Sequence, residues 1–291
     1  MTHDPISRFR RFARSVTTEV GALDESFLGR GRSLGAARVL NAIGHGRTDV
    51  AEVRQYLNLD SGLLSRLLRQ LESEGLITLS PHPTDARARI AALTPLGQSE
   101  FDAYEGISNT RASELFARHP RPEALLAAMD LIASALGQDR ITIEERDPRD
   151  PQSLFCLNEY YAELGRRFKT GFDVNLSCDP QATDMIPPRG AFLVAMSDGM
   201  PIGCVGVKGH GGDTAEIKRL WIAPSARGLG LSKRLMTAAE TRARELGIST
   251  LRLDTNSALP EAVRLYQTSG WTEIDRFNDD PYPDHFFEKR I

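Results

Sequence analysis

Apolar residues in the first half of the chain recur with the period of an α-helix. In the segment 61–75 they follow the i, i+3, i+4, i+7 rule and therefore face a core. These positions are Leu64, Leu67, Leu68 and Leu71. Similar patterns predict further helices over residues 6–28, 33–43, 48–57, 95–118 and 121–136. Thr48 and Asp60 are the expected N-caps of the helices that begin beside them, because their side chains can accept a hydrogen bond from the first turn.

The opposite face of the helix over 61–75 carries small and basic residues. They are Ser61, Gly62, Ser65, Arg66 and Arg69. In a major groove of DNA, the hydroxyl groups and the helix N-terminus would meet phosphates, and an arginine would reach O6 and N7 of guanine. A solvated face of an amphipathic helix is the alternative interpretation of the same residues.

Two short strands are predicted after this helix, over residues 76–79 and 89–93. The segment between them carries Asp85 and Arg87. Such a hairpin beside a recognition helix forms a wing, which would place Arg87 at its tip in a minor groove. The first half therefore has the element order of an all-α winged helix-turn-helix domain.

The helical pattern gives way to shorter apolar runs in the second half. These runs predict strands over residues 141–143, 190–196, 202–208, 214–222, 250–254, 271–276 and 285–290. Asp198-Gly199 is typical of a two-residue hairpin turn. Helices are predicted through Tyr160 and Leu164, and over 229–246 and 259–268. This order predicts an α+β domain with a mixed, mainly antiparallel sheet and a helix after the fourth strand.

A glycine-rich loop, Arg227-Gly228-Leu229-Gly230-Leu231-Ser232, joins the fourth strand to the next helix. Glycine permits unusual φ values, so that neighbouring N–H groups can turn outward together. Together with the positive end of the helix dipole, these donors form a site for a phosphate or pyrophosphate. The alternative is a helix-entry loop that binds no ligand.

Length and charge limit the possible organisation. A chain of 291 residues suits about two domains, which we expect at 1–138 and 139–291. The first 140 residues carry 17 arginines against 17 Asp plus Glu, so DNA binding must depend on where the arginines lie. No apolar run approaches the ~20 residues of a membrane span and no signal-like segment follows Met1, so we expect a cytoplasmic protein without a membrane partner. Cys156, Cys178 and Cys204 indicate buried thiols rather than a metal site or a disulfide framework.

The first half resembles the MarR family of transcriptional regulators over roughly residues 7–136. The resemblance lies in the helix-turn-helix, Glu74-Gly75-Leu76-Ile77, the Asp85-x-Arg87 wing and Leu93-Thr94-Pro95-Leu96-Gly97. It implies that Asp85 orients Arg87, that Arg87 contacts DNA, and that a homodimer binds a pseudo-palindromic double-stranded operator. The outer helices would supply the dimer interface, although their apolar positions also suit an intramolecular core. These positions are Phe9, Phe12, Val16, Leu115, Phe116, Leu125 and Leu126.

The second half resembles the GNAT family of acetyl-CoA-dependent N-acyltransferases over residues 140–291. Arg227 and Gly230 match the family's loop pattern, Ser232 replaces its last small residue, and residues 265–271 resemble a second family segment. The resemblance implies acetyl-CoA as cofactor, with its pyrophosphate on the loop N–H groups and its pantetheine beside the fourth strand. The implied cofactor residues are Leu220, Trp221, Ile222, Arg227, Gly228, Leu229, Gly230, Leu231, Ser232 and Asn256.

Two residues are candidates for proton transfer. Glu216 lies eleven positions before Arg227, where some GNAT enzymes carry a general base, but it could equally pair with Lys218 on the same face of the strand. Tyr266 matches the family tyrosine that often protonates the leaving thiolate, but it could also only pack. Asn256 could likewise have an ordinary turn role.

The acceptor is expected to be a small amine or amino-acid-like metabolite. The loop 278–285 is acidic and aromatic, and Glu159, Tyr160 and Tyr161 are expected nearby, which suits an ammonium group. Solvated loop charge explains the same residues. The chain is thus interpreted as a transcriptional regulator joined to an N-acetyltransferase. Two alternatives stay open: a regulator whose second domain is a non-catalytic ligand sensor, and a protein-lysine acetyltransferase.

Overall fold

The computed structural model describes residues 4–85, 87–169, 171–176, 184–209 and 211–291. The chain forms two compact units, Met1–Pro122 and Glu123–Ile291. The helix over Pro122–Leu136 (α6) therefore groups with the second unit, whereas the expected domain boundary at 138/139 assigns it to the first. Ala86, in the expected wing, and Cys178 lie outside the described residues. No helix in the described ranges is long and apolar enough to cross a membrane.

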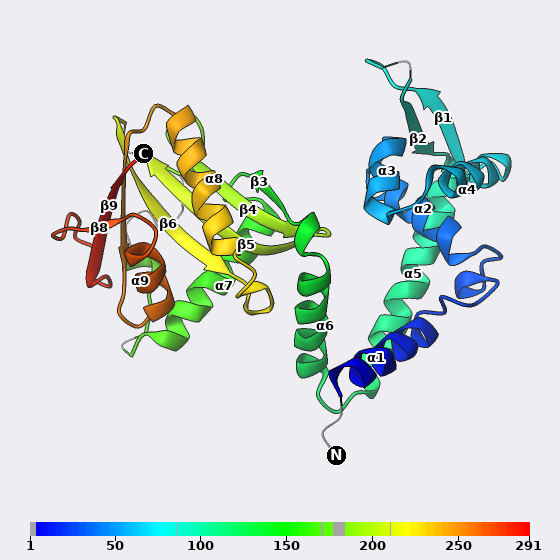
Figure 1. Ribbon diagram of the computed structural model, residues 1–291, viewed down its shortest axis with the longest axis horizontal. Coiled ribbons are helices and arrows are strands. Elements are labelled where there is room, and N and C mark those ends of the chain that lie inside the picture. The colour runs from blue at the N-terminus through cyan, green and yellow to red at the C-terminus, as the bar shows by residue number, and fades with distance from the viewer. Residues whose placement is uncertain (1–3, 86, 170, 177–183, 210) are drawn as a thin grey trace. The chain divides into compact units, whose positions relative to one another are not determined.

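The first unit has the expected order of helices followed by a hairpin (Figure 1). Its elements are α1 (Pro5–Glu19), η1 (Phe27–Gly29), α2 (Leu34–Gly44), α3 (Val50–Leu57), α4 (Ser61–Ser73), β1 (Ile77–Pro81), β2 (Arg89–Leu93) and α5 (Pro95–Arg118). The first helix ends at Glu19 instead of reaching residue 28, because the chain turns at Gly21 with a φ of 66°. The four leucines expected in the core of this unit are all buried on α4.

One of the two predicted N-caps is wrong. Asp60 caps α4 as expected, since its Oδ1 accepts the Leu63 N–H at 2.9 Å. Asp49, not Thr48, caps α3, and its Oδ1 accepts the Ala51 N–H at 2.6 Å. The Thr48 carbonyl accepts the Ala91 N–H of β2 at 2.8 Å, so Thr48 pairs with the wing and the helix begins after it.

The segment that joins the wing to α5 is held by its threonine and glycine. Thr94 Oγ1 accepts the Gly97 N–H at 3.0 Å, which caps α5, and donates to the Gly75 carbonyl at 2.6 Å. A Cβ atom at Gly97 would lie 1.8 Å from the Leu76 carbonyl oxygen. The start of α5 therefore approaches the start of the wing as closely as only glycine permits.

The second unit is a seven-stranded sheet with helices on both faces. Its elements after α6 are β3 (Thr142–Glu145), α7 (Pro151–Arg167), β4 (Ala191–Ser197), β5 (Met200–Gly209), β6 (Thr214–Ile222), α8 (Leu231–Glu245), β7 (Thr250–Thr255), α9 (Pro260–Gln267), β8 (Thr272–Glu273) and β9 (His285–Arg290). The strand order is β3-β4-β5-β6-β7-β9-β8, and all neighbours are antiparallel except β6 and β7. The expected mixed, mainly antiparallel sheet and the helix after the fourth strand are confirmed.

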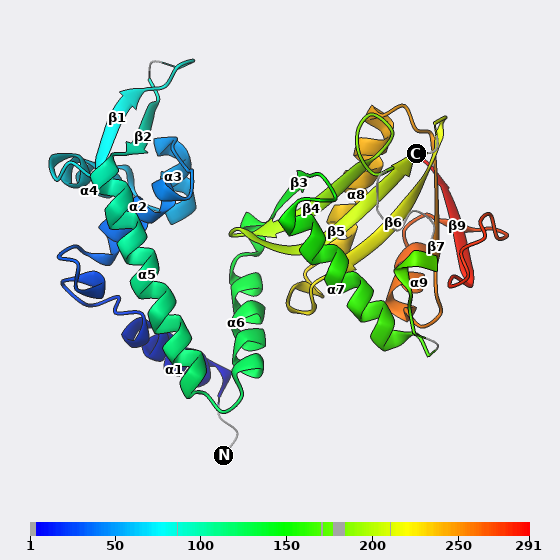
Figure 2. The ribbon, with the colours of Figure 1, turned by 180° about the vertical axis from the view of Figure 1, so that it is seen from behind.

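Helix α8 lies over one face of the sheet (Figure 1) and α7 over the other (Figure 2). The core beneath α8 also includes α9, through Tyr266. The core beneath α7 contains Cys156 and Cys204, which are both buried and free, as expected for structural thiols. The turn between β4 and β5 has positive φ at Asp198 (49°) and Gly199 (85°), which confirms the predicted hairpin.

The two glycines of α5 give a matched test of the close approach at its start. We expect Gly97→Ala to destabilise the first unit by about 2 kcal/mol, because the new methyl group collides with a backbone carbonyl. Gly106→Ala meets no heavy atom within 4 Å and should stabilise the same helix by up to about 1 kcal/mol. Hydrogen exchange of the α4 and α5 amides in the full chain measures both effects, and equal protection in the two variants would contradict this explanation.

Candidate functional site

In the sheet of the second unit, the neighbouring strands β6 and β7 are paired over only part of their length. The two strands pair in parallel from Thr214 opposite Thr250 to Ile217 opposite Leu253, and no further. Beyond that point residues 218–222 of β6 have a strand partner only on the β5 side. The unpaired edges of β6 and β7 therefore leave a gap in the sheet.

A β-bulge lies on β6 at the same place. Cys204 of β5 faces Trp221 and Gly206 faces Lys218, so that Val205 stands opposite two residues, Arg219 and Leu220. Arg219 has a φ of 57°, a left-handed conformation that is costly for a residue with a side chain. Bulges bend a strand and redirect its side chains, and this one turns β6 away from β7.

The glycine-rich loop lies at the far end of β6. Gly228 and Gly230 have φ values of 80° and 74°, and Gly230 is the N-cap of α8. A Cβ atom at either glycine would meet nothing within 4 Å, so the loop borders open space. No side chain caps α8, which leaves its first N–H groups available to an anion.

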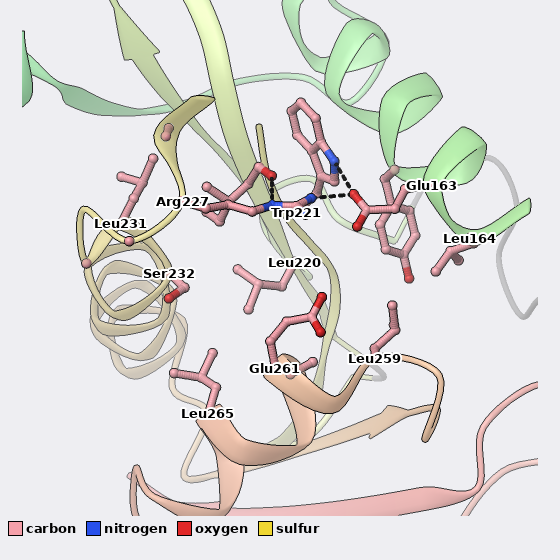
Figure 3. A pocket seen from close by; sticks show the side chains of 16 residues that line it. Glu163, Leu164, Leu220, Trp221, Arg227, Leu231, Ser232, Leu259, Glu261 and Leu265 are labelled. Carbon is pink, nitrogen blue, oxygen red and sulfur yellow. Dashed lines mark hydrogen bonds and ion pairs between the residues drawn. The ribbon is translucent and has the colours of Figure 1, made fainter. Parts of the chain in front are cut away.

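The loop, β6 and α9 enclose a first cavity of about 250 Å³ (Figure 3). Its lining is apolar along β6 and α9 and becomes polar at the loop and at two carboxylates, Glu163 and Glu261. Eight of the expected cofactor residues line it: Leu220, Trp221, Ile222, Arg227, Gly228, Gly230, Leu231 and Ser232. Leu229 and Asn256 are not in this lining.

Glu163 on α7 connects the residues that form the wall of the first cavity. The sequence did not predict a role for Glu163 in this site. Its Oε2 accepts the indole N–H of Trp221 at 3.1 Å and a guanidinium N–H of Arg227 at 2.6 Å (Figure 3). Its other carboxylate oxygen lies 3.4 Å from Arg167, which also pairs with Glu261. Arg227 also donates to the Ile222 carbonyl at 3.1 Å, so its charge is directed to the wall. No spacing signal in the sequence links residue 163 to the loop.

A second cavity of about 80 Å³ adjoins the first. The two linings share five residues: Tyr160, Leu164, Leu220, Leu259 and Ala262. The lining of the second cavity also includes Asp254 and Asn256 at the end of β7 and Arg219 at the bulge. It further includes residues of the loop 278–285, here called the C-terminal loop. A long ligand can therefore lie in the first cavity and extend its end into the second.

Tyr266 of α9 lines the second cavity. It is only 5% exposed, and its ring packs edge-on against Trp271. Burial raises the pKa of the Tyr266 hydroxyl well above its ordinary value, and the nearby Asp254 carboxylate raises it further. The hydroxyl is therefore a proton donor at any physiological pH.

Glu216, the other proton-transfer candidate, is placed differently. It is 7% exposed and lies 3.1 Å from the Lys218 ammonium, the pairing that the sequence left as the alternative. Lys218 lines the second cavity and also contacts Asp254 at 2.6 Å, whereas Glu216 is absent from the lining. Burial alone would lower the pKa of Lys218, but the carboxylates of Asp254 and Glu216 raise it overall. The lysine is thus a cation between Glu216 and the cavity.

Asn256 and the C-terminal loop belong to the second cavity. The Asn256 amide donates to the Tyr282 carbonyl at 2.6 Å, and its oxygen accepts the Ala258 N–H at 2.8 Å, which is a turn role. Tyr160 and Tyr161 lie in the same lining as Asp280 and Tyr282, as expected. Glu159 does not, since it lines a different hollow beside α6.

The first unit presents the other candidate site. The residues expected to contact DNA on α4 are all exposed, namely Ser61, Gly62, Ser65, Arg66 and Arg69. In the wing, β1 pairs with β2 from Ile77 opposite Leu93 to Pro81 opposite Arg89. The Asp85 carboxylate accepts the backbone N–H of Arg87 at 2.9 Å, so it fixes the turn that carries the exposed arginine.

Comparisons with known proteins agree with this division of the chain. The model of the MarR family matches residues 30–88, and that of the acetyltransferase (GNAT) family matches residues 157–271. An IAA acetyltransferase of Azospirillum brasilense is 35% identical over 157 residues, which are 52% of this chain and 98% of that protein. An uncharacterized N-acetyltransferase of Schizosaccharomyces pombe is 38% identical over 99 residues, 33% of this chain, which spans only 61% of that relative's length.

Among solved structures, a GNAT-family acetyltransferase from Staphylococcus aureus is similar with a TM-score of 0.46 and 18% identity, over 52% of this chain and 98% of that one. Members of the GNAT family use acetyl-CoA, the cofactor expected from the loop. The chain belongs to the acetyltransferase (GNAT) family, with a domain of the MarR family preceding the acetyltransferase domain.

Proposed function

We propose that this chain transfers an acetyl group from acetyl-CoA to a small amine and that its first unit binds operator DNA as a homodimer. The observation that carries the enzymatic proposal is that the two cavities adjoin and share five lining residues, with Tyr266 in the second. A cofactor bound at the loop can extend along β6 and bring its thioester to that tyrosine.

The first cavity suits CoA in shape and polarity. The N–H groups around Gly228–Ser232 and the N-terminus of α8 would bind the pyrophosphate, and the apolar part of β6 would contact the pantetheine. In the free protein Arg227 is paired with Glu163, although its side chain is 39% exposed. We infer that the guanidinium is shared between Glu163 and the phosphates when the cofactor is bound.

The chemistry requires two proton transfers. The amine nitrogen forms a bond to the acetyl carbonyl carbon, the C–S bond breaks, and Tyr266 protonates the departing thiolate. The attacking nitrogen loses a proton, for which Glu216 is our candidate acceptor. Because Lys218 separates Glu216 from the cavity, Glu216 would act through a water molecule.

The DNA-binding proposal rests on the exposed face of α4 and the wing. Dimerisation is supported by α1, which has no buried residue and carries a stripe of exposed apolar side chains. The stripe consists of Ile6, Phe9, Phe12, Val16 and Val20, with Phe9 62% exposed. An exposed apolar stripe of this length is typical of a protein–protein interface. A second copy of the chain would bury it and would double the DNA-recognition surface. Leu126 on α6 is also exposed, whereas Leu115, Phe116 and Leu125 are half-buried.

Tyr266→Phe tests the proton donor. We expect kcat for amine-dependent thiol release from acetyl-CoA to fall by about 100-fold, because the thiolate must leave without a positioned acid. The raised pKa means that the donor stays protonated, so the wild-type rate should show no loss from Tyr266 up to about pH 10. Tyr56→Phe removes a hydroxyl from α3 and is the control. Binding of acetyl-CoA without thiol release from any amine would favour the sensor alternative.

Glu163→Gln tests the role of Arg227 at the loop. The amide still accepts from Trp221 but no longer pairs with the guanidinium, which is then free for the pyrophosphate. We expect the Kd for CoA to fall about fivefold, equivalent to about 1 kcal/mol, and Arg227→Ala to raise it about tenfold. Calorimetric titration measures both, with Glu245→Gln, an exposed acid at the end of α8, as the control. A higher Kd in Glu163→Gln would contradict the shared role of Arg227.

Arg66→Ala tests the recognition helix. On a duplex selected by the protein from a random library, we expect affinity to fall by about 1–3 kcal/mol, because the arginine would contact a base edge or a phosphate. The control is Arg118→Ala, at the C-terminal end of α5. This variant should bind the selected duplex as the wild type does. Fluorescence anisotropy at fixed salt gives both affinities. Equal losses in the two variants would show that α4 has no special role.

A further inference from the structure

Four of the aromatic side chains that line the second cavity form one cluster. They are Tyr161, Phe168, Phe172 and Tyr282. Tyr161 stacks on Phe172 with ring centroids 5.8 Å apart, and Phe172 and Tyr282 are 4.8 Å apart. Phe168 contacts the same two rings, at 6.0 Å from Phe172 and 5.7 Å from Tyr282. The rings therefore form one continuous wall from α7 to the C-terminal loop.

A hydrogen bond joins the two ends of this wall. The hydroxyl of Tyr282 accepts the Asp173 backbone N–H at 2.8 Å, which ties the segment after α7 to the C-terminal loop. Every one of the four side chains is only half-buried, unlike the core aromatic residues Phe192 and Phe287. Aromatic surface that is held in place beside a cavity but left uncovered favours a ligand that can cover it.

The charges in the same lining balance. The cations are Lys218 and Arg219, and the carboxylates are Asp254 and Asp280, so two positive charges face two negative ones. Arg219 and Asp280 are themselves buried. A polyamine or an aminosugar with several ammonium groups would need an excess of carboxylates, which the described residues of this lining do not supply. The cavity thus selects by aromatic contact rather than by net charge.

Two of the rings also border a hollow on the surface. Phe168 and Tyr282 line both the second cavity and a hollow on the surface, which also carries Arg167 and Lys169. An acceptor that enters from this hollow would meet these two rings first. This arrangement suits a small molecule that enters whole.

We propose that the acetyl acceptor is a small primary amine attached to an aromatic ring, which stacks within the wall while its nitrogen reaches the thioester. The inference rests on the proposed acetyl transfer. The neutral amine nitrogen bonds to the acetyl carbon as the C–S bond breaks, and Tyr266 protonates the departing sulfur. The nitrogen then loses its extra proton through water to Glu216, which gives an N-acetyl arylalkylamine and CoA thiol.

Steady-state thiol release with the full chain and acetyl-CoA tests this acceptor class. The acceptors are phenethylamine, its saturated counterpart 2-cyclohexylethylamine, and spermidine. We expect kcat/KM for phenethylamine to exceed that for the cyclohexyl amine about fivefold, as ring–ring contacts allow, and to exceed that for spermidine at least about tenfold. An equal or higher kcat/KM for spermidine or for the saturated amine would overturn the proposal while leaving acetyl transfer intact.

The matched variant is Phe172→Leu, which keeps an apolar side chain but removes the ring. It should raise KM for phenethylamine about fivefold, raise KM for the cyclohexyl amine by less, and leave CoA affinity unchanged. A loss of the same size for both amines would overturn the aromatic wall as the source of selectivity. Acetyl-CoA binding without release from any amine would overturn acetyl transfer itself, and the acceptor class with it.

Discussion

The arrangement of the second unit depends on the parting of β6 from β7. Among the described strands these are the only parallel neighbours in the sheet, and the crossover through α8 that joins them places the glycine loop at the end of β6. Their pairing stops at Ile217 and Leu253, and the bulge at Arg219 bends β6 just beyond that point. A continuous ladder here would satisfy more backbone groups, but it would close both cavities. The ladder is interrupted where a ligand must lie in the sheet.

Ion pairs and charged hydrogen bonds connect the elements that line this opening. Glu163 connects α7 to the end of β6 through Trp221 and Arg227, and Lys218 connects β6 to β7 through Asp254. Both groups lie in cavity walls where an unpaired charge would be costly, so each is held by a partner. The pairs keep the walls in position across a gap that no backbone hydrogen bond spans.

The sequence predicted most of the elements and much of the first cavity. The ranges 89–93, 95–118, 214–222 and 285–290 were predicted with the bounds that the structure has, because their patterns are regular and end at clear turn or cap signals. The loop residues were also predictable, since positive φ at Gly228 and Gly230 is a local property. Thr48 was mistaken for a cap because its pairing with β2 is a contact between residues far apart in the chain.

The remaining features depend on long-range contacts in the same way. Glu163 reaches Arg227 across 64 residues, and Tyr282 meets Phe172 only because the C-terminal loop folds back over α7. Neither the periodicity nor the spacing of residues in the sequence predicts such long-range contacts. Glu216 shows a further limit: its place on the strand was predicted correctly, but only the structure shows Lys218 between it and the cavity.

We propose that one continuous opening of the second unit holds both the cofactor and the acceptor. Its most direct test is the affinity of a conjugate in which the CoA sulfur is joined through an acetyl bridge to the nitrogen of phenethylamine. We expect this conjugate to bind at least about 100-fold more tightly than CoA, because one ligand occupies both cavities. A conjugate that binds no more tightly than CoA itself would contradict it.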